Sequence, residues 1–303
     1  MAKLYTPAME KIDKRVAKRK SGFKADSPAR EAWKRLIRNK TAVVGMIMII
    51  IMLLCAIFAD FIAPYDYITN NYSALKQAPS AEHLFGTDNL GRDIFSRCIY
   101  GARWSILIAL FCVCCNVLVG GLIGTIAGYM GGKVDNAIMR VMDVFQAIPS
   151  VMMAICIVAI LGNGIPQLVA AMTISGMPGA ARNFRAAILN VKSGEYVESS
   201  KAINLGHFKM IMKHLLPNAL GILAIFVVNM LAGSILTISS LSYIGVGISP
   251  PTPEWGCILS QNKAYLMTYP YTVLFPAGCI MFAIFGFNLF GNGLRDAVDP
   301  RLK

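Results

Sequence analysis

Apolar residues in this chain gather into long uncharged runs, and charged residues collect between them. A helix rises about 1.5 Å per residue, so about 20 residues are needed to cross the ~30 Å hydrocarbon core of a bilayer. Stretches of that order lie at residues 41–59, 104–132, 144–181, 215–253 and 264–294. The pattern therefore predicts an all-α polytopic membrane protein.

The third stretch, residues 144–181, is too long for one crossing and is interrupted by the run GNGIP at 162–166. Glycine and proline are strong helix breakers, so this stretch is expected to form a hairpin that crosses out and back. The total then becomes six transmembrane helices. The fourth long stretch should end its span near Ser239, and the last span should cover about residues 273–289.

Composition and charge agree with this interpretation and set the orientation. The chain is 56% apolar and 15% charged, too apolar for the surface of a soluble globule of 303 residues. Lys and Arg accumulate on cytoplasmic loops, and placing both ends inside puts 24 of the 29 there, including Lys133 and Arg140 of a short internal segment. The net charge of +13 is thus an orientation signal, and no nucleic-acid partner is expected.

The eight cysteines show no metal-ligand spacing, so no metal site is expected, and most of them fall inside apolar runs. A disulfide between Cys98 and Cys257, both placed outside, is left open. Ionisable residues are absent from the middle of the predicted spans, whereas ion-coupled transporters usually need them there. The energy source for any transport is therefore expected to lie in another subunit.

Two smaller features concern helix packing. Residues 1–40 form a basic cytoplasmic tail in which Ser27-Pro28 is typical of a helix start. This helix either lies on the inner leaflet through Trp33, Leu36 and Ile37 or is a plain basic flank of the first span. Glycines at every fourth position of the second span should allow another helix to approach closely: Gly120, Gly124 and Gly128.

The most informative internal segment is the loop at residues 182–217, which is longer than the other cytoplasmic loops. It contains EYVESS at 195–200 and HLLPN at 214–218, and Tyr196, Val197, Ser200 and Ile203 recur at helical spacing. A short helix with a small apolar face, held away from the membrane, can dock into a groove of a partner. An ordinary amphipathic connector is the alternative.

These two runs resemble the EAA loop of ATP-binding-cassette (ABC) importer permeases, which forms a coupling helix in a cleft of the ATPase subunit. Alanines are usual where Ser199 and Ser200 stand, and a glycine is usual at Asn204, with Gly206 two residues later. The resemblance assigns ATPase coupling to ten residues: Glu195, Tyr196, Val197, Glu198, Ser199, Ser200, Ile203, Asn204, Gly206 and Pro217.

Three further runs resemble the C-type subunit of the oligopeptide/dipeptide permease group: HLFGTDNLGRDIFSR at 83–97, GYMGG at 128–132 and PPTPEWG at 250–256. Asn292 stands where that group commonly has aspartate. The implied extracytoplasmic signature is Gly86, Thr87, Asp88, Gly91, Arg92, Asp93, Pro251, Trp255 and Gly256. Its charged residues either pair with one another or receive a binding protein, and Trp255 is interpreted as an interfacial anchor.

The resemblance implies a type I ABC importer transmembrane domain in a bacterial inner membrane, with both ends in the cytoplasm. Residues 41–100 would form the first helix and an outer loop, and residues 101–303 a five-helix core. The implied partners are a homologous B-type permease subunit, two cytoplasmic ATPase subunits, an extracytoplasmic binding protein and a peptide substrate.

The chain is not expected to be an enzyme or to bind a cofactor of its own. Gly132-Lys133 is the nearest match to a phosphate-binding loop, but Val134 follows where Ser or Thr would bind magnesium. ATP and magnesium would therefore be used by the partner subunits. The alternatives are an importer of nickel or another small solute, an ion-coupled secondary transporter and, more weakly supported, a membrane-embedded enzyme.

Overall fold

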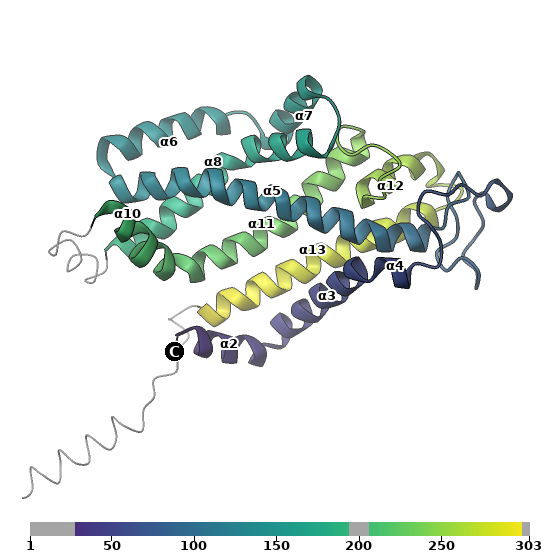
Figure 1. Ribbon diagram of the computed structural model, residues 1–303, viewed down its shortest axis with the longest axis horizontal. Coiled ribbons are helices and arrows are strands. Elements are labelled where there is room, and N and C mark those ends of the chain that lie inside the picture. Colours follow the sequence, from purple (N-terminus) through teal and green to yellow (C-terminus); the bar gives the residue numbers. More distant parts are fainter. Residues whose placement is uncertain (1–27, 194–205, 299–303) are drawn as a thin grey trace, which may run out of the picture.

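The computed structural model describes residues 28–193 and 206–298, and the regular elements in this part of the chain are helical, apart from one antiparallel bridge between Thr87 and Asp93. The long helices run side by side in an elongated bundle (Figure 1). The chain's described C-terminal residues lie at one end, and the long loop after the first span lies at the other. Following the orientation predicted from the charges, we call these the inner end and the outer end.

The first span is helix α3 (Lys40–Ile57), within two residues of the predicted limits. Its start is set by Asn39, whose side-chain oxygen accepts the Thr41 N–H at 3.0 Å and so caps a free backbone donor. Helix α2 (Pro28–Arg38) precedes it and buries Leu36, while Trp33 and Ile37 stay exposed. This exposure suits a helix lying on a surface.

Helix α5 (Ile94–Met130) is longer than predicted, because it begins ten residues before Trp104. The sequence pattern placed Arg97 and Arg103 in the outer loop, but both lie within the helix. Arg103 is accommodated there by an ion pair with Asp60, at 2.9 Å, on the short helix α4 (Ala59–Ile62). Pairing of this kind lets a span start before its uncharged run.

The predicted break at 162–166 is present, because α7 (Ser150–Leu161) ends and α8 (Ile165–Lys192) begins on either side of it, whereas the two crossings of the predicted hairpin stay a prediction. Gly162 adopts φ +87°, a left-handed conformation that favours glycine. A second break was not predicted. The segment around Lys133 and Arg140 forms helix α6 (Gly132–Gln146), which meets α7 at a bend of 77°.

The last two long helices also extend beyond the predicted limits. Helix α11 (Leu216–Ile244) continues five residues past Ser239 and is capped by Gly245. Helix α13 (Tyr271–Val298) covers the predicted 273–289, with two further residues at its start and nine at its end. The short elements are η1 (Tyr72–Ala74), α10 (His207–Met210), the π-helical η2 (Ile211–Leu215), α12 (Trp255–Asn262) and η3 (Lys263–Tyr265).

In the described residues, four helical segments are long and apolar enough to cross a membrane: α3, α5, α13 and the continuous segment His207–Ile244. The bent pair α6 and α7 would supply a fifth if it forms one span. Helix α8 has the length of a span, but its second half is polar. The all-helical membrane architecture is confirmed, and the total of six spans stays a prediction.

The glycine series of α5 packs against α8, as predicted. A side chain at Gly124 would collide with the carbonyl of Ala181, and one at Gly120 would meet Ala180 at 2.6 Å. Because glycine has no side chain, the backbones of the two helices come into contact at these positions, which is a common way for helices to associate in lipid. The pair α5 and α8 forms the centre of the bundle (Figure 1).

Candidate functional site

Tight turns shape the outer loop that carries most of the signature residues. Gly86 and Gly91 have φ values of +76° and +74°, so each turn uses a left-handed conformation. A side chain at Gly91 would also collide with the carbonyl of Asn71. The two turns bracket Asp88 and direct its side chain inward, where it is fully buried.

Asp88 is the centre of a buried ionic cluster. Its carboxylate lies 2.7 Å from the guanidinium of Arg92 and 2.5 Å from that of Arg97, and it also accepts the backbone N–H of Leu90 at 2.8 Å. Both arginines donate to the side-chain oxygen of Gln261, at 2.5 and 3.0 Å. Each charge has a partner, as burial of ionised groups requires.

Asp93 has a different role from Asp88. One of its carboxylate oxygens accepts the Ser96 N–H at 2.7 Å and caps α5, and the other lies 3.0 Å from Nδ1 of His83. Thr87 reaches the same region of the loop through its bridge to Asp93. Asp88 and Arg92 therefore pair with each other, which is the structural alternative stated from the sequence, whereas Asp93 is satisfied by His83 and the Ser96 backbone.

Trp255 is not the interfacial anchor predicted from the sequence. It is 2% exposed, and its indole N–H donates to the carbonyl of Cys98 at 3.0 Å. Glu254 caps the helix that Trp255 begins, accepting the N–H groups of Gly256 and Cys257 at 2.9 Å. The prediction was wrong because the aromatic side chain packs inside the bundle, where its N–H finds a backbone partner.

The remaining signature residues lie around this core. A side chain at Gly256 would collide with the backbone of Ser239, so the glycine allows α12 to pack on α11. Pro251 is exposed and lies outside the ionic cluster. Cys98 and Cys257, the candidates for a disulfide, are buried free thiols.

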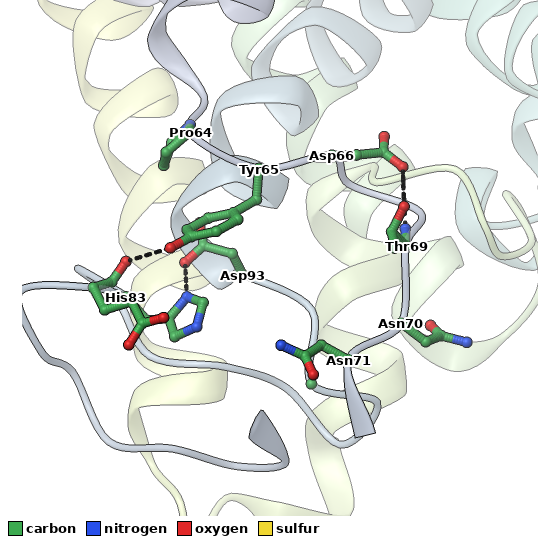
Figure 2. Close-up of a pocket in the computed structure, with 10 residues that line it drawn as sticks. Pro64, Tyr65, Asp66, Thr69, Asn70, Asn71, His83 and Asp93 are labelled. Atoms are coloured by element: carbon green, nitrogen blue, oxygen red, sulfur yellow. Dashed lines mark hydrogen bonds and ion pairs between the residues drawn. The ribbon is translucent and has the colours of Figure 1, made fainter. Parts of the chain in front are cut away.

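A hollow of about 450 Å³ lies beside the cluster, and Figure 2 shows its lining, which comes from the chain after α4 and from the loop at His83. Tyr65 lies against the His83 ring, with 4.9 Å between ring centres. Asp66 accepts hydrogen bonds from the backbone and hydroxyl of Thr69, and these bonds lower the pKa of its carboxyl group. The hollow is open and polar, unlike the closed cluster behind it.

At the inner end, eight of the ten predicted coupling residues, 195–200, Ile203 and Asn204, lie outside the described residues. Gly206 directly precedes α10, and Pro217 lies in the first turn of α11. One residue of α5 contacts the chain on both sides of residues 194–205. Lys192 donates to the Tyr129 carbonyl at 2.5 Å, and the Tyr129 hydroxyl lies 2.6 Å from Nδ1 of His207.

Two ion pairs connect α6 to α8 near this point. Arg185 pairs with Asp135 through two hydrogen bonds of 2.5 and 2.6 Å, and Arg182 pairs with Asp143 at 2.5 Å. The residues that hold the loop could not be found from motif spacing, because Tyr129 and His207 are 78 positions apart in the sequence. Sequence reasoning likewise missed Arg97, Gln261 and Glu254 at the outer end.

Comparisons with known proteins relate most of the chain to permeases of one kind of transport system. Residues 120–303 match the family described as binding-protein-dependent transport system inner membrane component, and residues 27–79 match the N-terminal TM domain of oligopeptide transport permease C. The dipeptide transport system permease protein DppC of Alkalihalophilus pseudofirmus is 41% identical over 281 residues, 93% of this chain and 92% of the relative.

Other relatives are similar to nearly the same extent. The oligopeptide transport system permease protein OppC of Bacillus subtilis is 40% identical over 90% of both chains. The glutathione transport system permease protein GsiD of Pectobacterium atrosepticum is 37% identical over 91% of this chain and 92% of the relative. A structure of the inward-facing MetNI methionine ABC transporter has a similar fold, with a TM-score of 0.55, 18% identity and coverage of 65% of this chain and 94% of that one.

Proposed function

The chain belongs to the family of binding-protein-dependent transport system inner membrane components, and from this membership we propose that it is the C-type permease subunit of an ATP-driven peptide importer. Members of the family are permease components of ABC importers, and their ATPase is a separate subunit. The chain is accordingly a multi-pass protein of the bacterial inner membrane and is not itself the enzyme.

One observation carries the choice of a peptide as substrate. Relatives with 37 to 41% identity over at least nine-tenths of both chains are named for dipeptide, oligopeptide and glutathione transport, and all three substrates are peptides or peptide-like. Similarity over this length includes the outer loop, the helical core and both ends of the coupling loop. We therefore place peptides ahead of nickel and other small solutes.

The proposed organisation follows from the charge distribution and the helix order. Residues 1–40 are cytoplasmic, residues 41–100 contain the first span and the outer loop, and residues 101–303 form a five-helix core. Six spans with both ends inside place the loop at 182–217 in the cytoplasm. A homologous B-type permease would complete the path, two ATPases would bind the cytoplasmic loops, and a binding protein would deliver peptide at the outer end.

The proposed coupling mechanism acts through residues 195–206. Tyr196 and Val197 fill a groove of the ATPase, and Glu198 pairs with a basic residue there. ATP-driven closure of the two ATPases then moves the loops and alternates access to the path. The double attachment of Lys192 and His207 to Tyr129 supports this proposal, because motion at either end of the loop is passed to α5.

The test is reconstitution of the complex purified from its native membrane in mild detergent. Recovery of a second permease and of subunits with ATP-binding motifs is expected, and peptide should stimulate ATP hydrolysis. Replacing Glu198 with Arg should abolish peptide uptake while ATP hydrolysis continues, whereas Glu198→Asp, which keeps the charge, should retain most uptake. Wild-type uptake by Glu198→Arg would refute the coupling assignment, and isolation of the chain without an ATPase would refute the importer assignment.

A further inference from the structure

A second polar region lies in the inner half of the bundle, away from the signature residues. It is a cavity of about 490 Å³ lined by α8, α11 and α13, and α11 packs against each of the other two helices (Figure 1). Three carboxamides and one guanidinium line it, supplied by all three helices: Asn183 of α8, Asn229 of α11, and Asn292 and Arg295 of α13. Ile222 and Phe226 provide its apolar wall.

The polar groups are arranged by depth. Arg295 is three residues from the end of α13, so it lies at the mouth of the cavity. Asn229 is thirteen residues into α11, about 20 Å along the helix and close to its midpoint. The cavity therefore leads from the inner surface toward the centre of the membrane.

Within the described residues, several polar groups that line the cavity keep hydrogen-bonding capacity that no other protein group satisfies. In the described part of the chain, Arg295 makes no ion pair and Asn229 makes no side-chain hydrogen bond. Asn183 uses only its amide nitrogen, which donates to the Gly179 carbonyl at 2.8 Å. Gly291 leaves room for Asn229, because a side chain there would come within 2.6 Å of the carboxamide oxygen.

Exposed carboxamides near the middle of a span cannot face lipid without a large desolvation cost. The surface of α3 beyond its first turn shows what a lipid-facing helix looks like here, since its exposed residues there, such as Ile47, Ile50 and Leu54, are apolar. The polar cavity must therefore face the water and ligand of a path, or a polar surface of the partner permease. In an importer, the space that holds both water and ligand is the translocation path.

We propose that this cavity binds the peptide during passage, with Arg295 receiving the C-terminal carboxylate and the three asparagines holding backbone amide groups; the inference rests on the proposed peptide import. A guanidinium binds a carboxylate through two parallel hydrogen bonds, and a carboxamide both donates and accepts, as a peptide group does. Ile222 and Phe226 contact the peptide's side chains without selecting among them.

The first test compares uptake of dialanine, trialanine and pentaalanine with uptake of their C-terminal amides, in vesicles containing the whole reconstituted complex. The wild type should import the free acids about ten times faster than the amides, because one charged hydrogen bond contributes about that factor to binding. Arg295→Gln should remove this preference, and Arg295→Lys should keep part of it. The matched control Lys133→Gln, which removes an exposed charge on α6, should behave as wild type.

The second test needs no transport. A photoreactive amino acid at Ile222, which lines the cavity, should capture trialanine in the complex, whereas one at Leu220 should not, because Leu220 is 60% exposed but lies outside the lining. Equal preference for acids and amides in the wild type, an unchanged preference in Arg295→Gln, or equal capture at the two positions would overturn the proposal. If none of the peptides is imported or stimulates ATP hydrolysis, the proposed function itself fails.

Discussion

The outer and inner ends of this protein use polar side chains in opposite ways. At the outer end Asp88, Arg92 and Arg97 are buried and paired with one another. In the inner cavity Asn229 and Arg295 are exposed and make no such pairs within the described residues. Both sets lie on or beside membrane-spanning helices, so nearness to the membrane does not explain the difference.

The difference separates groups that hold the structure from groups available to a ligand. A buried charge needs its partner permanently, because an unpaired ion in a low-dielectric interior costs several kcal/mol. An exposed carboxamide or guanidinium keeps its hydrogen-bonding capacity for a transient partner. The outer cluster is therefore a frame for the loop, although its charges are the ones that a motif search finds first.

The largest expected effect is at the outer frame. Asp88→Asn removes the negative charge between two buried arginines, and breaking a buried ion pair costs about 3–5 kcal/mol. We expect a marked fall in the melting temperature of the purified complex. Asp143→Asn, which breaks the half-exposed pair with Arg182 at the inner end, should change the melting temperature little. Equal effects would show that the Asp88 cluster is not a structural frame.

The next effect concerns the contact between α5 and α8, which connects the two ends. Gly124→Val forces a side chain against the Ala181 backbone, and overpacking of this kind costs about 1–3 kcal/mol. Loss of melting temperature and of complex yield should follow. Gly179→Ala is the control, since a Cβ there meets no atom within 4 Å. A tolerated valine at 124 would mean that the helices are less closely packed than described.

A smaller and more selective effect is expected at the attachment of the coupling loop. Tyr129→Phe removes the hydroxyl next to His207, an interaction worth about 1 kcal/mol, but keeps the ring. The amount of peptide imported per ATP hydrolysed should fall, with little change in melting temperature. Tyr72→Phe, an exposed change in the outer loop, serves as the control. An unchanged ratio would show that the hydroxyl does not transmit motion.

The smallest effect is a pH dependence in the outer hollow. Hydrogen bonds from Thr69 lower the pKa of Asp66 below its ordinary value of 3.8, so the carboxylate contributes stability above that pH and loses it as the pH falls through the lowered value. Thr69→Val should therefore lower the melting temperature slightly at pH 7. The gap from wild type should close in strong acid, and a gap independent of pH would exclude Asp66 as its source.

Much of this architecture could be predicted from composition and from residues close together in the sequence. The helical class, the break at Gly162, the close approach at Gly124 and the self-pairing of Asp88 with Arg92 all depend on residues within a few turns of one another, or on a requirement such as span length that any bilayer imposes. Such features are readable from spacing and composition.

Long-range partners were not readable in this way. Gln261 is 169 positions from Arg92, and Trp255 is 157 positions from the Cys98 carbonyl that holds its indole. The residue type of Trp255 fits a membrane interface as well as a packed core, and only the docking of α12 against α5 decides between them. Arg97 can be buried in the first turn of α5 because Asp88 folds back to neutralise it.

The sequence by itself determined that this is a helical membrane protein of an importer family, because hydrophobic run lengths, charge asymmetry and long motifs are properties of the linear chain. Tertiary structure decided which polar side chains are buried and hydrogen-bonded within the protein and which stay accessible to water or a ligand. Asn229 and Asn183 look alike in the sequence to the buried Asn262, whose amide donates to Ile258. Their difference arises only from which helix faces pack together, since packing determines where water and a ligand can reach.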